Sequence, residues 1–149
     1  MKSRAQIAVD YYVKSGYNCS QAVAITYADL LSLDPMVCFK GMEAFGAGMG
    51  CRLGTCGAIS GAVYLAGFVT STGNMDDDKS NKSKATTYEL VSKILNEFHE
   101  QNHTVTCKDL KDPKGGMFHS CLDCIADAAI LVEKYLFEGQ FEEPTYYKK

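Results

Sequence analysis

Residues 55–70 read TCGAISGAVYLAGFVT and carry no charged side chain, and this stretch decides the expected fold. Its strongly apolar part runs from Ala58 to Val69, which is well short of the roughly 20 residues that a membrane-spanning helix needs. Ala58, Ala62 and Ala66 lie on one helical face, where small side chains allow close packing. A helix that is apolar on all sides belongs in the centre of a protein. We therefore expect a buried Gly/Ala-rich central helix and no membrane-spanning segment.

Apolar residues recur at the spacing of an α-helix before this stretch as well. Two helices are expected in the first part of the chain, separated at Ser15-Gly16. A short third helix is expected from Pro35 to about Phe45, because Asp34 is a good capping residue and proline is favoured at the first helical position.

Two further helices are expected after the central one. A long amphipathic helix follows the polar segment STGNMDDDKSNKS, and the last helix runs from Ser120 to about Glu138. The apolar stripe of the long helix contains Tyr88, Val91, Leu95 and Phe98. The chain shows no alternating strand pattern of useful length. The sequence predicts one compact all-α domain, residues 1–149, with five to six helices around the central helix.

Seven cysteines in 149 residues, about 5%, are the feature of the composition that needs an explanation. This share lies below that of a disulfide scaffold, roughly 8–10%, and an odd number excludes complete internal pairing. A net charge of −3 with 15 basic residues lacks the excess of positive charge that is typical of proteins that bind nucleic acid or an anionic membrane surface. The N-terminal residues do not resemble a signal or transit peptide, so we expect a cytoplasmic protein. In a reducing cytosol, clustered cysteines are more often catalytic or metal-binding than structural.

Four of the seven cysteines follow directly on a residue that caps helices well. The four pairs are Asn18-Cys19, Thr55-Cys56, Thr106-Cys107 and Ser120-Cys121. Each cysteine would stand in a first helical turn, where backbone N–H groups and the helix dipole stabilise a thiolate. The alternative is that small residues favour helix starts and that free cysteines fill the core. The candidate redox residues are Cys19, Cys56, Cys107 and Cys121.

Two other cysteines are additional redox candidates. Cys121-Leu-Asp-Cys124 is a CxxC at a helix start, a spacing at which two sulfurs on one turn approach each other or share a metal. Cys51 stands five residues before Cys56 in a glycine-rich segment that lacks the lysine and hydroxyl residue of a phosphate-binding loop. Cys38 is expected to be a core residue.

The order of these residues carries a resemblance to a known family. The pattern consists of Cys19, the segment Cys56-Gly-Ala-Ile-Ser-Gly61, the segment Cys107-Lys-Asp-Leu, and Cys121 at the start of an alanine-rich helix. This pattern, from Ala5 to about Leu136, resembles the C_GCAxxG_C_C family of redox-active proteins, small bacterial proteins of about this length. The resemblance implies a redox role for these four cysteines and genes that often lie near transporters. A related module of the split-Soret cytochromes holds an iron–sulfur cluster, although this chain lacks haem-attachment motifs.

Three functions are compatible with the sequence. In the first, clustered thiols carry out thiol–disulfide exchange or electron transfer with an unidentified redox partner protein. The chain is then a candidate thiol–disulfide oxidoreductase, in which Cys56 attacks an oxidised partner and another cysteine resolves the mixed disulfide. Four cysteines allow three pairings, and the sequence does not choose among them.

The second function is a metal-binding module. The same four cysteines, Cys19, Cys56, Cys107 and Cys121, would hold zinc or an iron–sulfur cluster, because four thiolates suit both. The third is a structural or interaction partner of a transporter, with incidental cysteines. A homodimer is a further expectation, since small redox modules that dock partners often dimerise.

Overall fold

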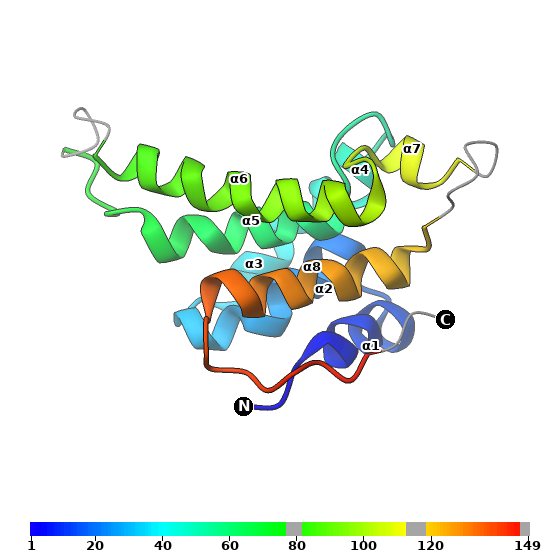
Figure 1. The fold of residues 1–149 in the computed structure, drawn as a ribbon, viewed down its shortest axis with the longest axis horizontal. Helices are drawn as coiled ribbons and strands as arrows, with labels where there is room; N and C mark the ends of the chain where they lie inside the picture. The colour runs from blue at the N-terminus through cyan, green and yellow to red at the C-terminus, as the bar shows by residue number, and fades with distance from the viewer. Residues whose placement is uncertain (77–81, 113–118, 147–149) are drawn as a thin grey trace.

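A computed structural model describes residues 1–76, 82–112 and 119–146 of the chain, and helices account for most of them. Figure 1 shows the elements α1 (Ala5–Ser15), α2 (Cys19–Tyr27), η1 (Ala28–Leu31), α3 (Pro35–Met42), η2 (Glu43–Phe45), α4 (Gly46–Met49), α5 (Gly57–Thr70), α6 (Lys82–Asn102), α7 (Cys107–Leu110) and α8 (Cys121–Leu136). The described residues contain no strand, only one isolated β-bridge. The all-α class is therefore confirmed for this part of the chain.

The expected number of five to six helices is too low. Six of the α-helices in the described residues have eight residues or more, but the one-turn helices α4 and α7 and the 3₁₀ helices η1 and η2 add to them. Helices of three or four residues are too short to show a helical period in the sequence, so the pattern of apolar residues could not reveal them.

Local capping explains where the first helices begin and end. α1 stops at Gly16, which adopts the left-handed conformation with φ of 73° that glycine accepts without strain. Asn18 caps α2 by accepting a hydrogen bond from the N–H of Gln21, whose side chain in turn accepts from the N–H of Asn18. Asp34 caps α3 in front of Pro35. The predicted break at residues 15 and 16 and the predicted start of α3 are confirmed.

The helix expected at the centre, α5, packs against α2, α6 and α8. A Cβ atom at Gly61 would lie 2.8 Å from the carbonyl oxygen of Ser20, so the backbones of α2 and α5 approach closely. The expected burial of this helix does not extend to its C-terminal end, where Phe68 is 49% exposed. Its last turns extend beyond α2, which is itself buried along nearly its whole length.

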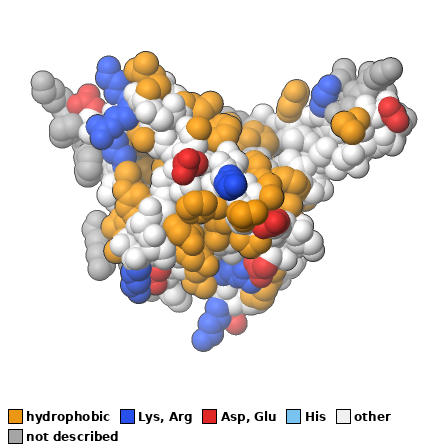
Figure 2. All heavy atoms as spheres, turned by 180° about the vertical axis from the view of Figure 1, so that it is seen from behind, with side chains coloured by type: hydrophobic (Ala, Val, Ile, Leu, Met, Phe, Trp, Pro, Cys, Tyr) orange, Lys and Arg blue, Asp and Glu red, His pale blue; other side chains and the backbone are white. Residues whose placement is uncertain are grey.

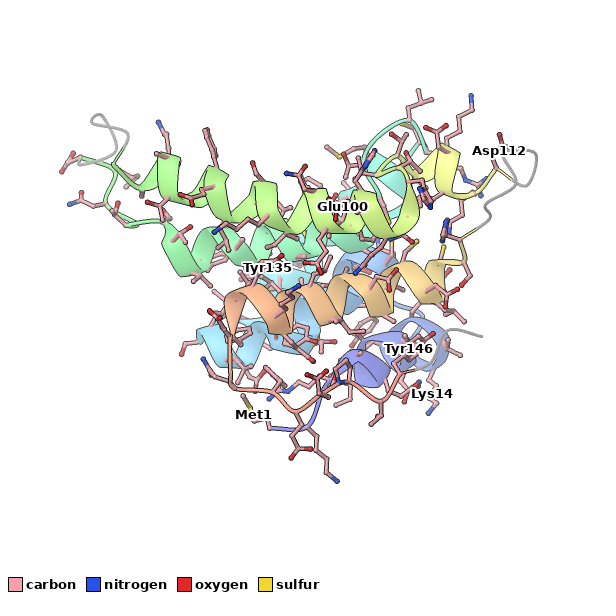
Figure 3. All side chains as sticks on the ribbon, viewed as in Figure 1. Met1, Lys14, Glu100, Asp112, Tyr135 and Tyr146 are labelled. Atoms are coloured by element: carbon pink, nitrogen blue, oxygen red, sulfur yellow. The ribbon has the colours of Figure 1, made fainter. Side chains whose placement is uncertain are left out.

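The last two long helices cover the other side of α5. Ile94 and Phe98 of α6 are fully buried, whereas Tyr88 is 66% exposed, so the predicted stripe is wrong at that residue. α8 ends at Leu136, two residues before the predicted Glu138. The tail then returns along the molecule, and Figure 3 shows Tyr146 beside α1. Among the helices of the described residues, none has the length and apolar character to cross a membrane.

Candidate functional site

Five cysteines line one pocket of about 250 Å³. They are Cys19, Cys56, Cys107, Cys121 and Cys124, together with Tyr12, Asn18, Ala47, Arg52, Gly57 and Lys111. The pocket forms where the starts of four helices meet, because α2, α7 and α8 begin with a cysteine and α5 begins directly after one. All four cysteines chosen from the sequence are thus brought together, and Cys124 joins them.

An antiparallel β-bridge between Thr55 and Thr106 holds two of these cysteines in place. The N–H of Cys56 donates to the carbonyl oxygen of Val105 at 2.7 Å, and the N–H of Cys107 donates to that of Gly54 at 3.0 Å. The two Thr-Cys dipeptides are therefore paired across the bridge. This pairing has no signal in the sequence beyond the repeated dipeptide.

The predicted caps differ in how they act. Asn18 and Ser120 cap α2 and α8 with their side chains, but Thr106 precedes α7 without a side-chain capping bond. The prediction that Thr55 caps the central helix is wrong, because Cys56 itself is the N-cap residue of α5. Thr55 takes part in the β-bridge instead, so the helix begins one residue later.

Cys56 and Cys124 form the most strongly interacting pair of the pocket. The Cys124 thiol donates a hydrogen bond to the sulfur of Cys56, and this bond lowers the pKa of Cys56 to about 7 although burial opposes the shift. The backbone N–H groups of Ala58 and Ile59 and the charge of Lys111 lower it further. The same hydrogen bond, together with burial, raises the pKa of Cys124. Part of the Cys56 population is therefore thiolate near neutral pH, whereas Cys124 keeps its proton.

Cys19 and Cys107 have the opposite character. Burial raises the pKa of Cys19 to about 11, and the neighbouring sulfur of Cys56 adds to this effect. Burial and the charge of Cys56 also raise the pKa of Cys107. A position in the first turn of a helix therefore does not make these two cysteines thiolates. Burying the charged form costs more free energy than the helix start contributes by stabilising its negative charge. Of the stabilised thiolates expected from the sequence, Cys19 and Cys107 are corrected to thiols.

Cys121 stands between two polar side chains that the sequence did not single out. A hydrogen bond to Cys121 raises the pKa of Tyr12 to about 12, and burial adds to this shift. Burial lowers the pKa of Lys111, but a hydrogen bond to Cys121 and the nearby sulfurs outweigh it and raise the pKa overall. The ammonium of Lys111 also donates to the carbonyl oxygen of His119 at 2.9 Å. It is thus a fixed cation among the thiols.

A sequence signal existed for only one of these two residues. Lys111 follows Cys107 by four positions, a spacing that brings side chains to the same side of a helical turn. Tyr12 belongs to α1 and reaches the pocket only through the packing of α1 against α8.

The remaining two cysteines lie outside the pocket. Cys51 is exposed, and its sulfur approaches the carbonyl oxygen of Gly48 at 3.9 Å. Cys38 is 1% exposed and accepts a hydrogen bond from the hydroxyl of Tyr64, which confirms its predicted place in the core. None of the seven cysteines, all of which are described, forms a disulfide.

Sulfur donors such as the thiols of the pocket suit zinc or an iron–sulfur cluster. Within the described ranges, no three side chains of histidine, cysteine, aspartate or glutamate are grouped so as to hold a metal ion. Cys124 instead bonds to Cys56 and Cys121 bonds to Lys111, whose positive charge would repel a metal ion. As arranged, the residues do not fit a metal centre.

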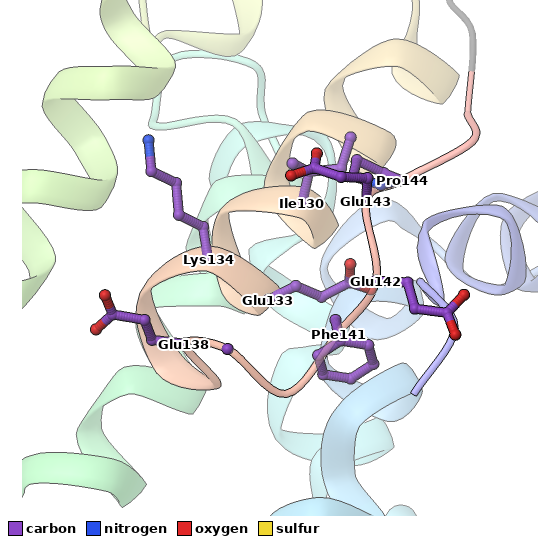
Figure 4. A pocket seen from close by; sticks show the side chains of 9 residues that line it. Ile130, Glu133, Lys134, Glu138, Phe141, Glu142, Glu143 and Pro144 are labelled. Atoms are coloured by element: carbon purple, nitrogen blue, oxygen red, sulfur yellow. The ribbon is translucent and has the colours of Figure 1, made fainter.

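Hollows without a cysteine also occur on the described surface, and two of them show what they contain instead. Figure 4 shows a pocket of about 430 Å³ between α8 and the tail, with Glu133, Glu138, Glu142 and Glu143 among its lining residues. Hydrophobic side chains gather on the face seen in Figure 2. An apolar groove of about 370 Å³ is lined by Met42, Phe45, Met49, Thr55, Ser60, Val63, Tyr64 and Leu95. Neither hollow combines a reactive group with a cationic partner as the cysteine pocket does.

Comparison with known proteins gave one match. A family model described as "Putative redox-active protein (C_GCAxxG_C_C)" matches residues 17–135, a range that contains all five cysteines of the pocket. Comparisons with curated proteins and with solved structures gave no match.

Proposed function

Because the chain belongs to the C_GCAxxG_C_C family of redox-active proteins, we propose that it is a thiol–disulfide redox protein whose reactive pair is Cys56 and Cys124. The observation that carries this proposal is that Cys56 and Cys124 line the same pocket and act on each other's protonation, so that the pKa of Cys56 is lowered while that of Cys124 is raised. A thiolate is the attacking species in thiol–disulfide exchange, and a second thiol within reach completes the reaction.

The exchange would proceed in two steps. The thiolate of Cys56 attacks one sulfur of an oxidised partner, a mixed disulfide forms, and the other partner sulfur leaves as a thiolate. Cys124 then passes its proton to that thiolate and attacks the sulfur of Cys56, and the partner's first sulfur is released. The partner disulfide is reduced to two thiols, the second of which takes its proton from solvent, and the pair is oxidised to a Cys56–Cys124 disulfide. The reverse sequence would oxidise a dithiol partner.

Lys111 supports both steps electrostatically. Its ammonium lies near Cys56, Cys121 and Cys124, so it stabilises the attacking thiolate and any thiolate that departs in the pocket. Such a cation favours thiolate chemistry over metal binding, which is the specific reason to prefer exchange to the zinc or iron–sulfur alternative. Association with a transporter and a homodimer stay predictions from the sequence.

Disulfide mapping tests the proposal. The reduced protein is treated with a low-molecular-weight disulfide, quenched by acid and alkylation, and analysed by mass spectrometry. We expect a Cys56–Cys124 linkage that is lost in the Cys56→Ser and Cys124→Ser variants but kept in Cys51→Ser, where an exposed cysteine outside the pocket is removed. Absence of the Cys56–Cys124 linkage from the oxidised wild type, or iron with visible charge-transfer bands after anaerobic purification, would contradict it.

A further inference from the structure

The reactive pair is hidden from a large partner. Cys56 is 5% exposed and Cys124 is 1% exposed, and the pocket cysteines Cys19 and Cys107 are buried as well. Exchange requires an incoming thiolate to approach the attacked sulfur along the axis of the disulfide. A small thiol can enter a pocket of about 250 Å³, but a cysteine on the surface of another folded protein cannot reach the bottom of it.

Cys121 is the pocket cysteine that solvent reaches. It is half-buried, whereas the four other cysteines that line the pocket are buried. Cys121 is the first residue of α8, and Ser120 caps this helix. The N–H of Cys124 donates to the carbonyl oxygen of Ser120 at 3.1 Å, so both cysteines lie in the first turn of α8. Residues three apart on a helix are neighbours. Cys124 thus interacts with Cys56 and stands one helical turn from Cys121, and all three residues line the same pocket.

The position of Cys121 is set by groups from two other parts of the chain. Tyr12 of α1 and Lys111, which follows α7, both bond to its sulfur. Lys111 is in turn held by the carbonyl oxygen of His119, two residues before Cys121. These are positioning residues, because they act on the sulfur of Cys121 and not on a partner.

We propose that Cys121 is an access thiol, through which a disulfide formed at Cys56 and Cys124 passes to the thiols of a protein-sized partner. This inference rests on the proposed function. Cys121 loses its proton to solvent and attacks the sulfur of Cys124, so that a Cys121–Cys124 bond forms while the Cys56–Cys124 bond breaks. Cys56 leaves as a thiolate, which the N-terminal amides of α5 stabilise. The number of disulfides is unchanged, so no further oxidant is needed.

A dithiol partner completes the transfer. One of its thiolates attacks the sulfur of Cys121 and releases Cys124 as a thiol, with a proton taken from solvent. The second thiolate of the partner then attacks the partner sulfur that is bonded to Cys121, and Cys121 is released. The partner is oxidised to a disulfide, and the pocket returns to its reduced state.

Two reductants of different size test the inference. The protein oxidised at Cys56 and Cys124 is treated either with 2-mercaptoethanol or with reduced thioredoxin as a protein-sized dithiol probe. We expect Cys121→Ser to lower the rate of reduction by thioredoxin, relative to the rate with 2-mercaptoethanol, at least about tenfold compared with the wild type. Cys51→Ser, which removes an exposed cysteine outside the pocket, should behave as the wild type with both. Equal rates for wild type and Cys121→Ser with thioredoxin, or no reduction of the wild type by it, would overturn the inference.

Disulfide mapping of two variants separates this inference from the proposed function. Oxidised Cys121→Ser should hold the Cys56–Cys124 linkage, and oxidised Cys56→Ser should hold the Cys121–Cys124 linkage. Absence of the first linkage in every protein contradicts the proposed function itself. Presence of the first and absence of the second contradicts only the role of Cys121. Far-ultraviolet circular dichroism of each variant establishes that its helices are intact.

Discussion

The sulfur of Cys19 lies against Gly57 so closely that a Cβ atom on residue 57 would stand 2.4 Å from it. The same Cβ would also lie 2.8 Å from the carbonyl oxygen of Phe45, so no side chain fits there without a backbone shift. The glycine that follows Cys56 thus allows the starts of α2 and α5 to meet. The cysteine pocket exists because this contact is possible.

Gly57→Ala should destabilise the protein, because the added methyl group overpacks the contact between α2 and α5. We expect a loss of about 1–3 kcal/mol in the free energy of unfolding, measured by urea denaturation. Gly67→Ala is the matched control in the same helix, since nothing lies within 4 Å of its Cβ position. It should raise stability by up to about 1 kcal/mol through helix propensity. A similar effect of both variants would contradict the packing that the structure shows.

The rate at which Cys56 is alkylated should depend on pH near neutrality. Because its pKa is lowered to about 7, alkylation by iodoacetamide should accelerate as the pH rises from 6 to 8 and level off above that range. Cys124→Ala removes the first cause of the shift, so the midpoint should move to higher pH. Site-resolved mass spectrometry of the alkylated protein measures both profiles. A midpoint that is the same in both proteins would show that Cys124 does not stabilise the thiolate.

Lys111→Met should raise the pKa of Cys56, because it removes the cation that favours the thiolate. We expect alkylation of Cys56 at pH 7 to slow by about three- to tenfold, while the rate at high pH stays near that of the wild type. Lys108→Met, which removes an exposed lysine from the neighbouring turn, is the control and should leave the profile unchanged. Lys111→Arg should retain most of the wild-type rate, since it keeps the charge.

Ser120→Ala and Thr106→Ala should differ in stability although the sequence predicts both residues as caps. Ser120 accepts a hydrogen bond from the N–H of Asp123 at 3.1 Å, and its loss should cost about 1 kcal/mol. Thr106 makes no side-chain capping bond to α7, so its substitution should cost only a few tenths of that amount. Thermal unfolding of the two variants checks the order.

Much of the fold could be predicted from local patterns. The break at Gly16, the start of α3 at Pro35 and the long helices after it depend on capping residues and on periodicity, which act within a few neighbouring positions. The prediction fails at Tyr88 because an apolar residue at the right spacing is buried only if another element covers it, and Tyr88 is 66% exposed. The one-turn helices around the pocket were missed because their form depends on the β-bridge and on close contacts such as that between Gly48 and Cys107.

The sequence by itself determined the all-α class, the family, and the choice of Cys19, Cys56, Cys107 and Cys121, which the structure brings to one pocket. Only the tertiary structure decided that Cys124 pairs with Cys56, that Cys51 stays outside, and that Tyr12 and Lys111 face Cys121. The physical reason is the distance along the chain over which each property is determined. A helix start is specified by adjacent residues, whereas the charge of a thiol depends on burial and on groups brought to it from distant parts of the chain.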